Sequence, residues 1–345
     1  MPPTLCLTGQ HATLEAGAFG LGGFPAVRLG CAGCEDPHEH VRAVSAALLP
    51  ALAHGPELMI VQGDTSSALG GALAACAAAV PVAHVEAGLR THDPLLPWPE
   101  EEYRAAIDAH AELLFAPTAV AAANLRAEHV SGQIHITGNT GIDALLAVEQ
   151  TLAPRVLGEA GPARLLITCH RRESWQNGLE SVAAAAAELA REDGTEVAVI
   201  LPPNAHVAMR MIDLLTDCPR VTLLEPCSHR ELLGRMLNAD VVLSDSGGMQ
   251  EEAPALGVPL LVLRDKTERP EGIASGCARL VGTSRERIVA EVRRLLNDPA
   301  ALASMSRRSL PYGDGHAAPR IARIVHDWLK ARELPLPLAG SARLS

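Results

Sequence analysis

Short apolar runs alternate with helix-forming segments along almost all of this 345-residue chain. The apolar runs predicted as strands are residues 5–8, 26–29, 58–62, 82–85, 113–116, 134–137, 164–168, 197–201, 221–224, 241–243, 260–263 and 278–281. The predicted helices between them include residues 39–52, 66–79, 100–110, 119–128, 179–191, 229–237 and 288–295. This alternation predicts βαβ units, in which helices cover both faces of a parallel sheet.

The alternation breaks at residues 151–163, where Pro154 and Pro162 interrupt it. We therefore predict an α/β protein with two doubly wound, Rossmann-like domains, residues 1–150 and 163–316. A helix at 317–332 is expected to cross back to the first domain. The two domains should face each other across a cleft at the carboxyl ends of their strands, where ligands bind.

The charge of the chain limits the partners that it can bind. Its formal net charge is −11, and no basic stripe with interleaved aromatic residues is present. This argues against nucleic acid and against a membrane surface. No apolar run has the length of a membrane span, and no signal peptide is recognisable. With eight cysteines, we expect a cytoplasmic protein with free thiols.

One short segment has a loose metal-ligand spacing. Cys31 and Cys34 are followed by His38 and His40, but no second ligand cluster accompanies them. We interpret the segment as a loop before a helix, and we expect neither a metal nor a cofactor.

One motif predicts a phosphate site. The strand at 241–243 is followed by Ser246-Gly247-Gly248, which opens a helix. Glycines let backbone N–H groups approach an anion, and a helix N-terminus adds partial positive charge. Glu252, one turn into the helix, can reach the two hydroxyls of a ribose. The motif predicts a nucleotide that carries a diphosphate and a sugar, and a simple glycine turn is the alternative.

Polar residues that suit acid–base chemistry follow several strands. Asp64, Glu86 and His170 come directly after strands, and Glu100 opens a helix. Carboxylates and an imidazole around one cleft can hold different pKa values through burial and mutual repulsion. Such a group suits removal of a proton from a weakly acidic carbon. A Ser-His-Asp hydrolase is disfavoured because no Gly-x-Ser-x-Gly elbow is present.

Together these motifs resemble those of the non-hydrolysing UDP-N-acetylglucosamine 2-epimerases. The match covers nearly the whole chain, in the order and spacing of the family. The matching stretches are residues 63–65, 84–91, 97–101, 137–140, 170–173, 245–254, 264–271 and 311–315.

The resemblance implies two Rossmann-like domains, similar to those of GT-B glycosyltransferases, and an isomerase activity. The enzyme would interconvert UDP-GlcNAc and UDP-ManNAc without metal or nicotinamide. In the family route, the C2 proton is removed and UDP is expelled, which gives 2-acetamidoglucal. UDP then adds back, and a proton reaches the opposite face. A homodimer is also implied.

The resemblance assigns roles to particular residues. Those implied for catalysis are Asp64, Glu86, Glu100 and His170, without an assignment of which one removes the proton. Those implied for substrate binding are Ser246, Gly247 and Gly248 for the diphosphate, Glu252 for the ribose, and Arg269. Arg90 and Arg171 are further candidates for phosphate or sugar contacts, and surface or interdomain ion pairs are the alternative for both.

The chain departs from the family at its start. Family members begin with a strand, a Gly-Thr-Arg-Pro-Glu turn and a helix, which supply an Arg and a Lys near the phosphates. Here the first strand, 5–8, matches the family's second, so about one βα unit, roughly 30 residues, is absent. Its loss should leave two unpaired strand edges or make the sheet close up. We expect a start upstream of Met1, or else a reduced homologue.

Smaller departures concern ligand binding. Pro202 stands where the family has a His, and Leu232 stands where it has an aromatic residue that packs on uracil, a contact worth around 1 kcal/mol. Gln10 and His11 match the family's regulatory stretch, whereas Thr13 does not. These positions bear on nucleotide affinity and on an allosteric response to UDP-GlcNAc.

Two other classes of function remain as alternatives. A UDP-sugar glycosyltransferase of GT-B type would need an acceptor and would not exchange the C2 proton, and the intact acid–base group argues against it. A non-catalytic or impaired homologue would bind UDP weakly and act as a partner subunit.

Overall fold

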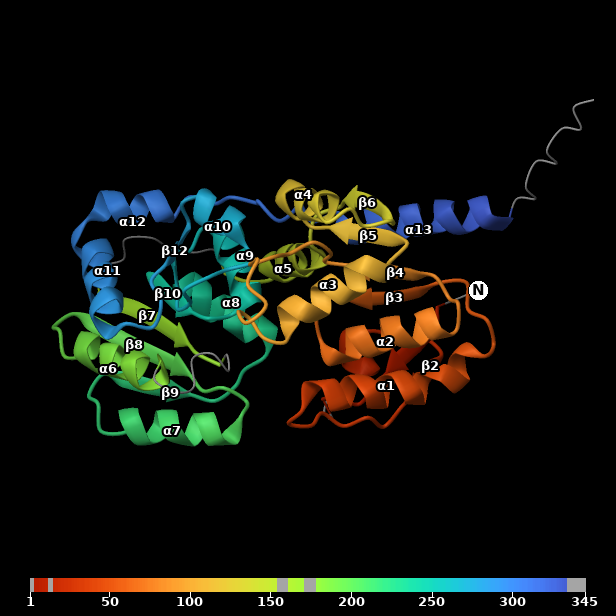
Figure 1. Cartoon of the computed structure of the whole chain (residues 1–345). Coiled ribbons are helices and arrows are strands. Elements are labelled where there is room, and N and C mark those ends of the chain that lie inside the picture. The colour runs from red at the N-terminus through yellow and green to blue at the C-terminus, as the bar shows by residue number, and fades with distance from the viewer. Residues whose placement is uncertain (1–2, 12–14, 154–160, 171–177, 334–345) are drawn as a thin grey trace, which may run out of the picture.

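The protein consists of two α/β lobes, each built on parallel strands (Figure 1). The computed structural model describes residues 3–11, 15–153, 161–170 and 178–333. One lobe carries β1 to β6 and the other carries β7 to β12, so the predicted α/β class is confirmed. Among the described helices, none is long and apolar enough to cross a membrane.

The first domain follows the predicted alternation closely. Its elements are β1 (Leu5–Leu7), the 3-10 helix η1 (Ala16–Phe19), β2 (Ala26–Arg28), α1 (Pro37–Leu52), β3 (Met59–Gln62), α2 (Ser66–Ala77), β4 (Val82–Val85), α3 (Glu100–His110), β5 (Leu113–Ala116), α4 (Ala119–Ala127) and β6 (Gln133–Ile136). Thr65 and Thr118 start α2 and α4, because their hydroxyls accept backbone N–H groups of the first turn.

The second domain is a complete doubly wound sheet. Its elements are β7 (Ala163–Thr168), α6 (Gly178–Ala190), β8 (Thr195–Ile200), α7 (Ala205–Leu215), β9 (Val221–Leu224), α8 (His229–Asn238), β10 (Val241–Ser244), α9 (Gly247–Leu256), β11 (Leu260–Val262), α10 (Pro270–Ala274), β12 (Ala278–Leu280), α11 (Arg285–Asn297) and α12 (Pro299–Met305). The strand order is β12-β11-β10-β7-β8-β9. The order reverses between β7 and β10, which places the ligand crevice at their carboxyl ends.

The strands of the first domain form two separate sheets instead of one. β3, β4, β5 and β6 make one sheet, while β1 and β2 make the other. A cavity of about 190 Å³ lies between their edges, lined by Cys6 and Thr8 on one side and by β3 on the other. The hydroxyls of Thr8 and Ser67 bond at 2.8 Å, which holds the carboxyl end of β1 beside the start of α2.

Comparison with the second domain shows which strand pairing is missing at this cavity. There the first strand, β7, pairs with both β8 and β10. In the first domain, the corresponding place between β1 and β3 holds the cavity, and Ile60 of β3 is 50% exposed. Of the two outcomes expected from the sequence, the described residues thus show two separated strand edges and not a closed sheet.

The chain crosses between the domains twice. α5 (Thr140–Glu149) follows the last strand of the first domain, but its Ile142 and Leu145 pack in the core of the second. Helix α5 thus packs with the second domain, although the predicted first domain extends to residue 150. α13 (Ala317–Glu333) passes back, and its Ile321 packs against Val85 and Phe115 of the first domain. In Figure 1, α5 lies between the lobes and α13 lies along the first domain.

Two glycines let the crossing segments touch. Gly138 has a φ of +87° and Gly313 a φ of +135°, values that favour glycine. A Cβ on Gly138 would lie 3.2 Å from the Cα of Gly313. The N–H of Asn139 donates to the carbonyl of Tyr312 at 2.7 Å. A side chain at either glycine would push the two crossings apart.

We predict that filling the cavity between β1 and β3 stabilises the protein. The change Cys6→Ile adds apolar volume at the cavity wall, and such changes typically gain about 0.5–2 kcal/mol. As a control, Ala26→Ile puts the same side chain at an exposed position of β2 that does not line the cavity. Urea unfolding should show the larger gain in the free energy of unfolding for Cys6→Ile. Equal gains would contradict the prediction.

Candidate active site

Residues from both domains line one cleft. A cavity of about 670 Å³ is bordered by Asp64 after β3, by Glu100 at the start of α3 and by His170 after β7. Three of the four residues predicted for acid–base chemistry therefore share one cavity, although they come from both domains.

Glu86, the fourth of these residues, lies against the backbone that carries Asp64. A Cβ on Gly63 would lie 3.3 Å from Oε2 of Glu86. Glu86 has a φ of +72°, which costs roughly 1–3 kcal/mol for a residue with a side chain. Surrounding contacts hold it there, because Arg269 and Asn139 donate to its Oε1 at 2.9 and 3.2 Å.

The surroundings of Glu86 shift the ionisation of its carboxyl group. Burial raises the pKa of Glu86, and the charge of Asp64 adds to this effect, while the charge of Arg269 opposes it. A carboxyl group with a raised pKa exchanges its proton nearer to neutral pH, where proton transfer to or from a substrate is most efficient.

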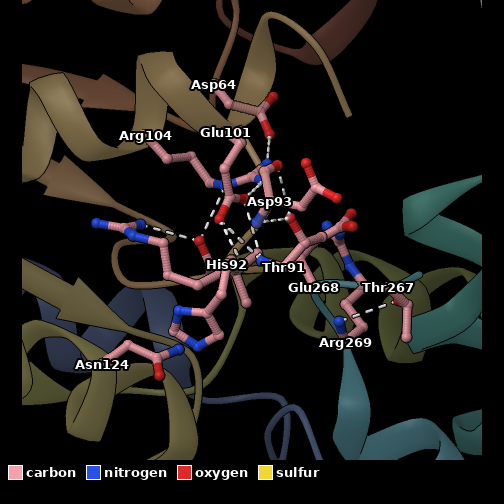
Figure 2. Close-up of polar contacts among 12 residues, drawn as sticks. Asp64, Thr91, His92, Asp93, Glu101, Arg104, Asn124, Thr267, Glu268 and Arg269 are labelled. Carbon is pink, nitrogen blue, oxygen red and sulfur yellow. Dashed lines mark hydrogen bonds and ion pairs between the residues drawn. The ribbon is translucent and has the colours of Figure 1, made fainter. Parts of the chain in front are cut away.

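A buried guanidinium holds the first-domain part of the site together. Figure 2 shows Arg104 between Asp64 and Glu101, and its two terminal nitrogens bond these carboxylates at 2.5 Å each. Glu101 in turn accepts the backbone N–H groups of Thr91 and His92 at 2.9 Å. Arg104 lies one helical turn after Glu100 on α3, so a single helix carries one catalytic candidate and orients another.

A second guanidinium joins the two domains. Arg269, which precedes α10, donates through Nε to Glu251 at 2.6 Å and through a terminal nitrogen to Glu86 at 2.9 Å. Its other terminal nitrogen bonds Glu268. Asn139 donates to Glu251 at 2.6 Å and so bridges Glu251 and Glu86. Burial raises the pKa of Glu251 to about 8, although the charge of Arg269 works against this rise.

The predicted phosphate motif forms the turn from β10 into α9. Ser246 is the N-cap, and Gly247 is the first helical residue. A Cβ on Gly247 would lie 2.8 Å from a terminal nitrogen of Arg269, so only glycine fits against this guanidinium. Gly248 is exposed. The turn presents backbone N–H groups at the start of α9, as an anion requires, while the charge of Arg269 is paired with Glu86, Glu251 and Glu268.

His170 is fixed beside this turn by Asp245, the residue after β10. The fully buried carboxylate of Asp245 accepts the backbone N–H of His170 at 2.9 Å and lies 3.1 Å from Nδ1 of its ring. Strands β7 and β10 are neighbours, and this explains why residues so far apart in the sequence meet.

Glu252, the predicted ribose ligand, has a partner that sequence reasoning missed. Its Oε1 lies 2.7 Å from Nε2 of His229, the first residue of α8. This hydrogen bond raises the pKa of His229. The pattern of Ser228 followed three residues later by Glu231 marks the start of α8, but nothing in the sequence places that start beside α9.

The other residues that the sequence suggested for ligand contacts or regulation lie in different parts of the structure. Arg90 is buried in ion pairs with Asp108 and Glu128 inside the first domain. Leu232 packs on the core of the second domain, and Pro202 is buried. Gln10 and His11 line the same cavity as Asp64. Arg171 and Thr13 lie outside the described residues.

The segment with metal-like spacing has other contacts. His40 is buried, with Nδ1 2.6 Å from the hydroxyl of Ser66 and Nε2 3.0 Å from the carbonyl of Cys31. His38 makes edge contacts with Trp98 and Tyr103. Within the part of the chain that the structure describes, no three His, Cys, Asp or Glu side chains are grouped to hold a metal.

Known proteins are similar to this chain in both sequence and fold. The chain matches the family model of the UDP-N-acetylglucosamine 2-epimerases over residues 1–326. It is 44% identical over 284 residues to a probable UDP-N-acetylglucosamine 2-epimerase of Ralstonia nicotianae, covering 78% of this chain and 76% of that protein. It is 42% identical over 280 residues to the UDP-N-acetylglucosamine 2-epimerase of Escherichia coli O157:H7, covering 77% and 74%.

Among solved structures, the chain is similar to UDP-GlcNAc 2-epimerase from Neisseria meningitidis bound to UDP-GlcNAc. The TM-score is 0.87 at 32% sequence identity, and the superposition covers 94% of this chain and 91% of that one.

We predict that Arg269→Met destabilises the protein strongly, because it leaves buried carboxylates without their cation. Loss of one partner of a buried pair costs about 3–5 kcal/mol. The control Arg285→Met breaks an exposed pair with Glu188 and should cost at most about 1 kcal/mol. Urea unfolding at pH 8 measures both.

The loss for Arg269→Met should shrink at pH 5.5. Burial raises the folded-state pKa of Glu86 and Glu251, so the folded state binds more protons, and these groups reduce stability as pH rises from about 4.3 towards 8. Without Arg269, the pKa values of Glu86 and Glu251 rise further. Protonation of these carboxyl groups at low pH then offsets the loss of the cation. An equal loss at both pH values would contradict the electrostatic explanation.

Proposed function

Because this chain belongs to the UDP-N-acetylglucosamine 2-epimerase family, we propose that its cleft interconverts UDP-GlcNAc and UDP-ManNAc by elimination and readdition of UDP. The reaction is non-hydrolysing, so the sugar leaves the enzyme still attached to UDP. The related protein of Neisseria meningitidis was solved with UDP-GlcNAc bound, which supports a UDP-sugar as the substrate.

One observation carries the proposal: Arg269 touches both the phosphate turn and an acid–base carboxylate. Its guanidinium lies against Gly247 and bonds Glu86 at 2.9 Å. A diphosphate on the turn therefore brings the attached sugar close to the carboxylates of the first domain. A site that only bound UDP would not need proton-transfer groups at this distance.

The chemistry balances with side chains of this kind. A carboxylate removes the proton from C2, the electron pair of that C–H bond forms the C1=C2 double bond, and the bond from C1 to the UDP oxygen breaks. In the return step, the UDP oxygen bonds to C1 and a protonated side chain gives its proton to the opposite face of C2. No electrons are lost or gained overall.

Two faces of the sugar ring require two different proton-transfer groups, one ionised and one protonated. Asp64, Glu86, Glu100 and His170 supply the candidates. The neighbouring charges and the burial of Glu86 differ from those of Asp64, which is 28% exposed and bonded to Arg104. Environments that push pKa values apart allow carboxyl groups to act as acid and base at the same pH.

The second domain supplies the nucleotide contacts in this proposal. Ser246, Gly247 and Gly248 hold the diphosphate through the start of α9, and Glu252 accepts the ribose hydroxyls. His229, which bonds Glu252, would orient that carboxylate. A homodimer and a second, regulatory UDP-GlcNAc near Gln10 and His11 follow from family membership, and the place of these two residues on the cavity wall supports the latter.

Hydrogen exchange at C2 tests the proposed function. In D₂O, the purified protein with UDP-GlcNAc should yield UDP-ManNAc with deuterium at C2 in both sugars, followed by NMR. Free sugar should not accumulate. A folded protein that gives no deuterium at C2 would contradict the proposal. Transfer of the sugar to an added acceptor without exchange would indicate a glycosyltransferase instead.

We predict that Glu86→Gln lowers turnover about 10²- to 10⁴-fold, the usual contribution of a general acid or base. The amide keeps the shape of the side chain but cannot exchange a proton at neutral pH. The matched control, Glu112→Gln, removes an exposed carboxylate whose partner is Arg332. Its turnover should equal that of the wild type. Turnover of Glu86→Gln within a few-fold of wild type would remove Glu86 from the catalytic group.

A further inference from the structure

One carboxylate outside the cleft is tied to several parts of the site at once. Asp108 lies on the buried face of α3 and is completely inaccessible to solvent. It accepts hydrogen bonds from Nδ1 of His84 at 2.6 Å, from Arg90 at 2.7 Å and from the backbone N–H of Gly88 at 3.1 Å. The helix that carries Glu100 and Arg104 is thus also hydrogen-bonded to the loop that follows β4.

The contacts of His84 determine its charge. This side chain in β4 is fully buried, and its second ring nitrogen, Nε2, lies 2.9 Å from the carbonyl oxygen of Gly63. A carbonyl oxygen and a carboxylate both accept hydrogen bonds and cannot donate them. Both ring nitrogens of His84 must therefore carry a proton, which makes the ring an imidazolium cation.

The surrounding charges balance within this group. His84 and Arg90 are cations, and Asp108 and Glu128 are the carboxylates that they contact. Burial alone would raise the pKa of Asp108, but the hydrogen bond and charge of His84, together with Arg90, lower it below its usual value. The carboxylate of Asp108 is therefore ionised and accepts the hydrogen bond of His84.

The two groups that this pair holds are the neighbours of the catalytic candidates. Gly63, bonded by His84, directly precedes Asp64 and lies against the carboxylate of Glu86. Gly88, bonded by Asp108, follows Glu86 by two residues. Gly88 has a φ of +84°, and a Cβ there would lie 2.3 Å from the carbonyl of Ala121, so this backbone is closely confined.

We propose that Asp108 and His84 are positioning residues of the epimerase reaction, which fix Asp64 and Glu86 relative to each other through a buried carboxylate–imidazolium pair. The inference rests on the proposed function. It differs from a general packing role because it requires a doubly protonated imidazole and not only a side chain of this shape.

The kinetic test is Asp108→Ala, which removes the carboxylate that His84, Arg90 and the N–H of Gly88 share. Nδ1 of His84 and the N–H of Gly88 then both lose their acceptor, so the backbone beside Asp64 and Glu86 is no longer held. We expect kcat to fall about 10- to 100-fold, as for a small misplacement of catalytic groups, while KM stays within about threefold. The nucleotide contacts lie in the other domain, so UDP affinity should be retained.

Glu128→Gln is the matched control. It removes the charge of the other carboxylate that Arg90 contacts, while the ion pair of Arg90 with Asp108 remains. The side chain of Glu128 is 37% exposed. We expect its kcat to stay within about twofold of wild type, since pairs near the surface contribute little. Equal losses in both variants, or a loss of UDP affinity that matches the loss of kcat in Asp108→Ala, would overturn the inference in favour of general destabilisation.

The spectroscopic test is made on the wild type. In ¹⁵N NMR of the histidine-labelled protein at pH 7, one imidazole should show N–H signals at both ring nitrogens, and His84→Gln serves only to assign them. A single N–H signal for His84 would overturn the inference. If the wild type turns over and Asp108→Ala is unaffected, the inference alone is overturned. If the wild type shows no C2 exchange, the proposed function is overturned as well.

Discussion

Buried guanidinium groups between carboxylates hold the site of this protein in place. Arg104 is fully buried and bridges Asp64 and Glu101, while Arg269 is 7% exposed and bridges Glu86, Glu251 and Glu268. A buried charge that loses its partner costs several kcal/mol, so these arrangements must be complete to be stable. Because Arg269 belongs to the second domain and Glu86 to the first, the position of one domain against the other also fixes Glu86, which we propose as a proton-transfer group. Figure 2 shows both guanidinium groups at this junction.

Helix α3 connects these local interactions. Glu100 lines the cleft, Arg104 orients Asp64, and Asp108 holds the loop after Glu86. Their spacing of four residues places them along one helix face. A polar stripe on a buried helix would destabilise a core unless every member had a partner. Arg104 and Asp108 have their partners at or beside the ends of β3 and β4, so the same contacts stabilise the domain and position the acid–base candidates.

The sequence predicts the strands and the turn from β10 into α9 well, because both depend on local patterns, which are the spacing of apolar residues and the position of glycines. It does not reveal the partners of those residues, since Arg269 meets Glu86 only after the domains come together, across 183 positions of the chain. The packing of α5 is hidden from the sequence for a similar reason. The apolar face of α5 fits either lobe, and only tertiary packing shows that Ile142 and Leu145 join the second core. The family resemblance correctly anticipates a gap at the first strand, but only the structure shows that β1 and β3 stay apart.

The most direct test of this account is a crystal structure of the protein with UDP. We predict phosphate oxygens within hydrogen-bond distance of the backbone N–H groups of Gly247 and Gly248, with Glu252 on the ribose hydroxyls and Arg269 still bonded to Glu86. That result would place the diphosphate and the proton-transfer carboxylates in one cleft. UDP bound away from the Gly247 turn, or Glu86 turned away from Arg269 and the cleft, would contradict the account.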